Sequence, residues 1–390
     1  MMFFHSPRLA AGLAISLFTL PGLPALAFDP SGNDVADTFL TLLDSEEGTV
    51  ESYGSIDTSA DTVTIRDLVI TNDEKDDAKV TIGTTQLIDG TVQDNGRLKL
   101  SGLAMENLEL AADDGGMTLN SLKATGLLLP SAEEVKADKA PVNPGYSTLE
   151  INGVLIRGED GQIADIAKIT SSIDGMDGDL PTAGSFSVSG ARIDVDKLET
   201  KETKSLSELG YKTLTVDLSA SGKWDPETAT LTVPELKVDA QDAASLSLSF
   251  SLGGVTREVI EQLNQNSDKP QQAMATLQTI TVQSIGIRLD DDSLTGRVLD
   301  AEAQKAGVET PVYVERLTGS LPMMLGMLQN QELQDKVQQA VTQYLTTPGS
   351  LEINAAPGVP VPMAQIMGTA MLAPHMIPQI LSVTIAANDR

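Results

Sequence analysis

The chain has 390 residues, a formal net charge of −29 and no cysteine. This length is sufficient for one large domain or two ordinary domains, each with its own hydrophobic core. The absence of cysteine excludes thiolate zinc sites, iron–sulfur clusters and thiol catalysis. Because the strong negative charge repels phosphate backbones and anionic headgroups, we expect no nucleic-acid partner.

Residues 1–27 have the features of a cleavable secretory signal peptide. Arg8 precedes an apolar run over residues 9–20, and a small-residue pattern ends at Ala27. We therefore expect Sec-dependent export, cleavage near Ala27, and a soluble periplasmic product with no transmembrane segment after cleavage.

The body of the chain has the pattern of a β protein. Residues 28–48 are expected to hold a short helix capped by Asn33, and a period of two begins at residue 49. The period is clearest in residues 245–252, where serines alternate with Leu246, Leu248, Phe250 and Leu252. Asp-Gly turn dipeptides separate such runs, so we predict about a dozen strands joined mainly as antiparallel hairpins.

An internal repeat extends over residues 49–210, with copies at about 60–129 and 146–210. The apolar positions of residues 63–70 recur in residues 149–156, and Ser101-Gly102 matches Ser189-Gly190. In each copy the apolar phase slips by one at the Ser-Gly pair, as a β-bulge would cause. We expect a mainly β fold, with an elongated, curved antiparallel sheet that continues through residues 211–300 with short helices.

The C-terminal part, residues 301–390, is predicted to form a helical cap rich in methionine and proline. One helix is expected to open at Ser320 and Pro322, and a second after Asn330. No charged residue occurs between Ile353 and Asn388, and the prolines there leave only residues 363–373 free to form a helix. That helix would be too short to span a bilayer. Its apolar stripe is either an adaptable surface for a lipid tail or partner helix, or a buried plug of the sheet.

Catalytic and metal-binding motifs are missing. The only histidine beyond the predicted signal peptide is His375, which has no charged neighbour in sequence. No nucleophile elbow, phosphate-binding loop, dinucleotide fingerprint or HExxH helix occurs. The acidic clusters at 73–77, 174–179 and 290–292 lack the spacing of known calcium loops. We therefore assign no catalytic residue, metal site or cofactor.

The long alternating strands, the run over residues 214–252 and the Asp-Asp-Asp-Ser-Leu-Thr-Gly stretch at residues 290–296 resemble the β-rich envelope proteins related to AsmA. They also resemble less characterised exported proteins of Gram-negative, alphaproteobacterial cells. The likeness covers residues 50–300 and is one of pattern. It implies an elongated sheet that curls into a groove for lipid acyl chains. The chain differs from AsmA in its cleavable signal, where an inner-membrane anchor is expected, and in its shorter length.

These observations favour a non-catalytic periplasmic envelope protein that binds or carries lipid acyl chains on a one-sided aliphatic sheet. The residues expected to form the apolar groove are Leu246, Leu248, Phe250, Met363, Met367 and Met371. The main alternative is a structural or protein-interaction module of the envelope, with a closed β core and no small-molecule ligand. A remote alternative is an enzyme that uses two carboxylates on an envelope polymer.

Overall fold

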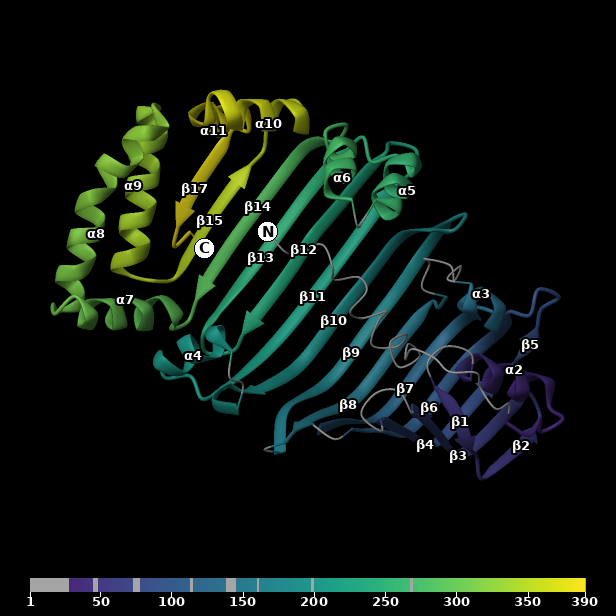
Figure 1. Ribbon diagram of the computed structural model, residues 1–390. Coiled ribbons are helices and arrows are strands. Elements are labelled where there is room, and N and C mark those ends of the chain that lie inside the picture. The colour runs from purple at the N-terminus through teal and green to yellow at the C-terminus, as the bar shows by residue number, and fades with distance from the viewer. Residues whose placement is uncertain are drawn as a thin grey trace. The chain divides into compact units, whose positions relative to one another are not determined.

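The fold is mainly β, and the strand pairings are antiparallel, as predicted (Figure 1). The chain divides into two compact units, unit 1 (Met1–Leu198) and unit 2 (Glu199–Arg390). The predicted signal peptide lies outside the described residues. The computed structural model describes residues 28–44, 48–72, 78–112, 115–137, 145–159, 161–197, 200–266 and 269–389.

Unit 1 is a meander in which neighbouring strands pair in the order β3, β4, β6, β7, β8, β9 and β10. Both β1 and β2 pair with β3, and β5 pairs with β6. The strands are β1 (Thr49–Ser52), β2 (Ser55–Ser59), β3 (Thr62–Asn72), β4 (Ala78–Ile88), β5 (Thr91–Val92), β6 (Leu98–Ala112), β7 (Gly115–Leu129), β8 (Thr148–Gly158), β9 (Gly161–Asp177) and β10 (Leu180–Asp194). The helical elements are α2 (Asp34–Leu43), α3 (Ala132–Lys136) and η2 (Val195–Lys197).

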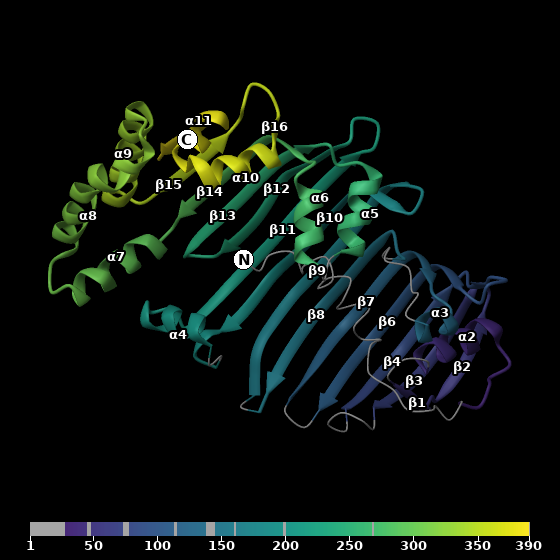
Figure 2. The same ribbon diagram turned by 45° about the horizontal axis from the view of Figure 1, so that its top comes forward.

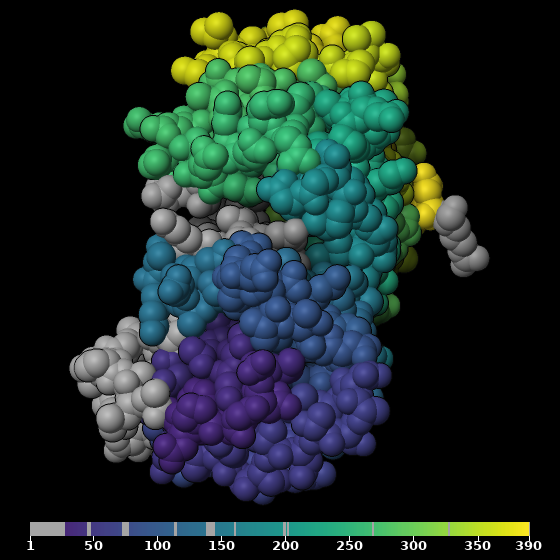
Figure 3. All heavy atoms as spheres, turned by 90° about the vertical axis from the view of Figure 1, so that its right-hand side faces the viewer, coloured from purple at the N-terminus to yellow at the C-terminus, as the bar shows by residue number. Residues whose placement is uncertain are grey.

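The predicted N-terminal helix is α2, and it packs into the core of unit 1. The Asn33 side chain accepts hydrogen bonds from the N–H groups of Val35 and Ala36, at 3.1 and 3.0 Å. Phe39 and Leu40 are fully buried among aliphatic residues of β3, β4, β6, β7 and β8. Figure 3 shows the first described residues, in purple, in contact with the residues that follow them in the chain, in blue. The apolar face of this part of unit 1 is therefore closed.

At one level of the unit 1 sheet, the alternation of side chains is interrupted on β3, β4, β6, β7, β8, β9 and β10. There the pairing register omits one residue on each strand: Asp67, Gly83, Asn107, Asn120, Gly153, Ala167 and Gly190. Every second member of this row has a positive φ, between 51° and 67°. Because the omission shifts the phase by one residue, Ile151 and Val154 both face the core and both are buried.

The row of omitted residues shows which positions of the two repeat copies are equivalent. Asp67 on β3 and Gly153 on β8 occupy equivalent places in it, as the sequence match predicts. Gly190 shares the row with Asn107, whereas Gly102 pairs with Thr125 at another level of the sheet. The register slips by one residue at both Ser-Gly pairs, as predicted, because Ser101 and Gly190 are left out of the strand pairing. The two slips lie at different levels of the sheet, so the pairs are not equivalent positions of the repeat.

Unit 2 contains a sheet in the order β11, β12, β13, β14, β15 and β17, with β16 paired to one end of β14 (Figures 1 and 2). The strands are β11 (Thr213–Asp225), β12 (Thr230–Ala240), β13 (Ala244–Gly253), β14 (Thr281–Asp291), β15 (Ser350–Ala355), β16 (Val361–Pro362) and β17 (Val383–Ala387). The helical elements are α4 (Lys201–Glu208), α5 (Arg257–Gln265), α6 (Pro270–Leu277), α7 (Leu294–Lys305), α8 (Thr310–Leu325), η3 (Gly326–Leu328), α9 (Gln331–Thr346), α10 (Met363–Leu372), η4 (Pro374–Met376) and α11 (Ile377–Ile380).

Two predictions for the C-terminal part need correction. Besides the helices of the predicted cap, the part contains β15 and β17, which extend the sheet and for which no strand was predicted. The first helix of the hairpin begins at Thr310 rather than near Ser320, and Pro322 lies inside it. Pro311 supplies the preset φ of this helix start, eleven residues before Pro322. Asn330 caps α9 as predicted, with its side chain accepting from the Leu333 N–H at 3.1 Å.

An ion pair between Arg97, just before β6, and Glu134 of α3 connects these two elements. The Glu134 carboxylate accepts hydrogen bonds from Arg97 at 2.6 to 3.0 Å and from the Ser131 N–H at 3.0 Å. These bonds, first of all the one from Arg97, lower the pKa of Glu134 to about 2. Both side chains of the pair are about one-quarter exposed, at 27% and 26%.

We expect Glu134→Gln to destabilise unit 1 at neutral pH by about 1 kcal/mol, since it removes a charge-assisted bidentate contact. The folded-state pKa is lowered from 4.5, so the ionised form adds stability above pH 4.5 and this contribution is lost as the pH falls toward 2. Urea unfolding of both proteins at a series of pH values measures the difference. A difference that stays constant between pH 6 and pH 3 would contradict the role of the charge.

Gly153 belongs to the row of residues left out of the strand pairing in unit 1. Its position there predicts that it tolerates no side chain. Its φ is +67°, and a Cβ atom there would collide with the Asn120 side chain. We expect Gly153→Ala to lower the free energy of unfolding by about 2 kcal/mol or more. Gly161→Ala is the matched control, because its φ is also positive but nothing lies within 4 Å of the added Cβ. Equal losses for the two variants would show that close packing at the row is unimportant.

Candidate functional site

One face of the unit 2 sheet is formed by aliphatic side chains. Directly opposed residues of antiparallel strands project to the same face, so the register identifies its members. The central row crosses β12, β13, β14, β15 and β17 through Leu236, Leu248, Ile287, Ile353 and Ile385. Aliphatic and aromatic residues also form the rows on either side of it, which include Leu246 paired with Leu289, and Phe250 paired with Ile285.

Helices cover the two ends of this face. At one end, Met363 and Ile366 of α10 and residues of α11 pack with Leu252 and Ile285. At the other end, Ala340 and Tyr344 of α9 pack with Leu289, Leu351 and Ile385. Figure 1 shows α10 and α11 at one end of β14 and β15, with α9 alongside β17. The helices therefore close both margins but not the middle.

The middle of the face is exposed. Leu246 is 49% exposed, Ile287 41%, and Val238 and Ile353 each 38%, whereas Leu248 and Phe250 are half-buried. We call this surface the open face and define it by Val238, Leu246, Leu248, Phe250, Ile287 and Ile353. Contiguous aliphatic surface of this kind is uncommon on soluble proteins and marks binding sites. The open face is therefore the candidate site.

The structure brings together half of the predicted groove residues. Leu246, Leu248 and Phe250 lie on the open face. Met363 packs at its covered end, and Met367 is half-buried on the same helix. Met371 is 86% exposed at the far end of α10, so the three methionines do not act as one stripe against the sheet.

Three members of the open face were not selected from the sequence. Val238 and Ile287 belong to strands with period-two patterns, and the pairing partners of Leu246 and Leu248 could have identified them. Ile353 lies in β15, within residues 301–390, which were predicted to form a helical cap and for which no strand was predicted. Short strands such as β15 carry too few residues for a period of two to be distinctive.

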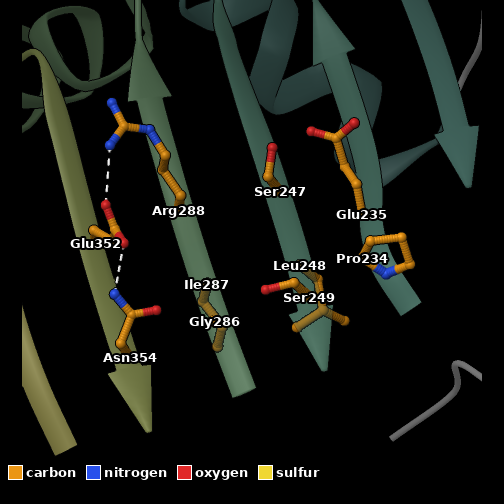
Figure 4. A pocket seen from close by; sticks show the side chains of 10 residues that line it. All are labelled: Pro234, Glu235, Ser247, Leu248, Ser249, Gly286, Ile287, Arg288, Glu352 and Asn354. Atoms are coloured by element: carbon orange, nitrogen blue, oxygen red, sulfur yellow. Dashed lines mark hydrogen bonds and ion pairs between the residues drawn. The ribbon is translucent and has the colours of Figure 1, made fainter. Parts of the chain in front are cut away.

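The opposite face of the same sheet is polar and holds a shallow pocket. Figure 4 shows Glu352 between Arg288 and Asn354, with Ser247 and Ser249 on the neighbouring strand. The Arg288 guanidinium donates to Asp290 at 2.6 to 3.0 Å and to Glu352 at 3.1 Å. The hydrogen bond to Asp290, more than that to Glu352, raises the pKa of Arg288. With two carboxylates on one guanidinium, this pocket has no surplus positive charge for an anionic ligand.

The carboxylates of this pocket do not fit a glycosidase pair. Glu235 lies on β12 and Glu352 on β15, and two strands separate them. At the usual strand spacing the two side chains are ~14 Å apart. Hydrolytic carboxylate pairs lie roughly 5 to 9.5 Å apart. This geometry gives the carboxylate-enzyme alternative no support from this pocket.

In the described part of the chain, no group of three or more His, Asp or Glu side chains is arranged to hold a metal ion. The acidic cluster at 73–77 lies outside the described residues. Asp291 caps a turn instead, since its carboxylate accepts from the Thr295 N–H at 2.7 Å. Within the same described residues, every helix is too short or too polar to cross a bilayer.

A family model described as "Uncharacterized protein" matches residues 237–388. No curated protein matches the chain. The matched segment contains every residue of the open face together with α7 to α11.

Because the Ile287 side chain is exposed, we expect it to contribute little to the free energy of unfolding. We expect Ile287→Ala to cost less than about 1 kcal/mol, whereas Ile280→Ala should cost about 2 to 5 kcal/mol. Ile280 is 3% exposed next to the same strand, so it is a matched control. Trp224 is the sole tryptophan, is buried, and donates to the Val255 carbonyl at 2.7 Å, which makes its emission a probe of unit 2 in urea unfolding. A large loss for Ile287→Ala would mean that the open face is covered in solution.

Proposed function

We propose that this protein is a non-catalytic envelope protein that holds lipid acyl chains on the open face of unit 2. The supporting observation is the uncovered middle of an otherwise closed aliphatic face, with Ile287 and Ile353 at its centre. A soluble protein normally covers such a surface, because its contact with water is unfavourable by roughly 25 cal/mol per Å². A bound apolar chain would remove that cost.

The dimensions of the central row suit one acyl chain. Its residues span β12 to β17, which at the usual strand spacing is ~19 Å. The hydrocarbon core of a bilayer is about 30 Å thick, so an acyl chain within one leaflet extends roughly 15 Å. A chain lying across the strands would contact aliphatic side chains along its whole length.

The charge of the protein limits the headgroup. All six members of the open face are apolar, and the chain carries a net charge of −29. Acyl chains with uncharged or zwitterionic headgroups suit such a surface better than strongly anionic lipids. The headgroup would remain at the margin of the face, in water.

The expectations of export and of a relation to AsmA belong to this proposal. A signal peptide over residues 1–27 would deliver the protein to the periplasm, where lipids must pass between two membranes. The AsmA-like pattern agrees with a sheet whose apolar side serves acyl chains. The alternative of a closed structural module suits the α2 region of unit 1, where Phe39 and Ile65 are fully buried, better than it suits unit 2.

The first experiment is native mass spectrometry of the protein purified from a periplasmic extract, followed by organic extraction and lipid analysis. We expect a bound lipid, and tight binding of a fluorescent fatty acid to the delipidated protein. The double variant Leu246→Gln, Ile287→Gln should weaken that binding at least about tenfold, because it places two polar groups under the chain. Recovery of the protein from the periplasm tests export separately.

The matched control is Ser247→Gln. Ser247 lies between Leu246 and Leu248 but projects to the opposite face of β13, so this variant should bind the fatty acid normally. A protein free of lipid, together with equal fatty-acid binding by all variants, would refute the proposal. A stoichiometric protein complex covering the same face would support the interaction module instead.

A further inference from the structure

The open face is wider on β12 and β13 than on β15. One of its rows begins with Val238 and Leu246, which are opposed to each other and exposed. The same row continues through Leu289 and Leu351, and both of these side chains pack with α9. The helix therefore covers this row from β14 onward.

The neighbouring central row stays uncovered for two more strands. Ile287 on β14 and Ile353 on β15 are both exposed. The next residue of the row, Ile385 on β17, packs with Tyr344 of α9, and Figure 1 shows α9 alongside β17. We call the row from Leu248 through Ile287 and Ile353 to Ile385 the slot. It is open at β13 and closed at β17.

On β15 the slot is one residue wide. The residues that flank Ile353 on the same face are Leu351, which packs with α9, and Ala355, which is buried in the cluster with α10 and α11. Rows on one face of a strand are two residues, or ~7 Å, apart, so the uncovered strip has about this width. A helix with its side chains is about 10 to 12 Å across. The slot therefore does not admit a partner helix.

The slot suits an acyl chain better than an extended peptide. A peptide laid across the strands would place backbone N–H and C=O groups against aliphatic side chains, without hydrogen-bond partners. An acyl chain carries no such groups, and every residue of the slot is leucine or isoleucine. A strip one row wide accommodates one chain but not two side by side.

We propose that the slot takes a single acyl chain with its terminal methyl group first, and that α9 limits the length of chain that is buried. The proposal rests on the lipid-binding function proposed above, and it names the ligand class as lipids with one acyl chain, either a lysophospholipid or a free fatty acid. The methyl end lies against Ile385 beside Tyr344. The polar end lies in water at the β12–β13 side, where the face is widest. From β13 to β17 the buried length is three strand spacings, ~14 Å.

The first test compares chain lengths. Lysophosphatidylcholines and free fatty acids with eight to eighteen carbons are used to displace a fluorescent fatty acid from the delipidated protein. We expect the affinity to rise about fourfold for each added methylene, as for a buried CH₂ group, and to stop rising once the chain fills the slot. Because the protein is strongly acidic, lysophosphatidylcholine should bind more tightly than the fatty acid of equal length, and the reverse order would identify a free fatty acid as the ligand.

The second test shortens the slot. Ile353→Trp places a larger side chain at an exposed position, so it should block the path to Ile385 without disturbing the core. We expect the longest chains to lose at least about tenfold in affinity and the shortest to lose little. Thr384→Trp is the matched control, because Thr384 is exposed next to Ile385 but projects to the polar face with Asn354. Circular dichroism verifies that both variants are folded.

The outcomes separate this proposal from the function on which it rests. If no lipid binds to the unaltered protein, the proposed function itself fails. If lipids bind with an affinity that does not depend on chain length, or if the Ile353→Trp and Thr384→Trp variants bind long chains equally, the slot is refuted while lipid binding stands. Two single-chain lipids bound to each protein, measured by native mass spectrometry, would also refute it.

Discussion

The candidate site depends on the fixed relation between register and face in an antiparallel sheet. Opposed residues share a face, and a slip of one residue would turn an entire strand over. In unit 2 the register places Leu248, Ile287 and Ile353 side by side, although they come from distant parts of the chain. The polar network of Arg288 with Glu352 occupies the reverse side for the same reason. The pairing register of the strands therefore gives the unit 2 sheet one apolar face and one polar face.

The two units use the same strand pattern with different outcomes. In unit 1, the row of residues left out of the pairing, which includes Gly153, keeps apolar residues on one face over long strands. One side of α2, with Phe39 and Leu40, packs on that face. In unit 2, the helices pack at the two ends of the face and leave its centre exposed. The difference between a core and a binding surface therefore lies in what covers the sheet, not in the strands themselves.

This difference also sets the limit of prediction from sequence. The alternation of Leu246, Leu248 and Phe250 reveals a one-sided strand, and Asn33 and Asn330 reveal helix starts, because these signals are local. Whether a helix lies over Ile287 is decided by contacts between segments far apart in sequence. β15 was missed for a related reason, since its six residues are stabilised as a strand by pairing with β14 and β17. The start of α8 differs from the prediction because Pro311, rather than Pro322, lies in its first turn.

The absence of charge in residues 353–388 follows from the several places that this segment occupies. Its strands β15 and β17 contribute Ile353 and Ile385 to the aliphatic face, where a charge would be poorly solvated. Its helix α10 packs Met363 against the same sheet. Neither role accounts for Met371 and Leu372, which are almost fully in water and could be polar at no cost to the fold.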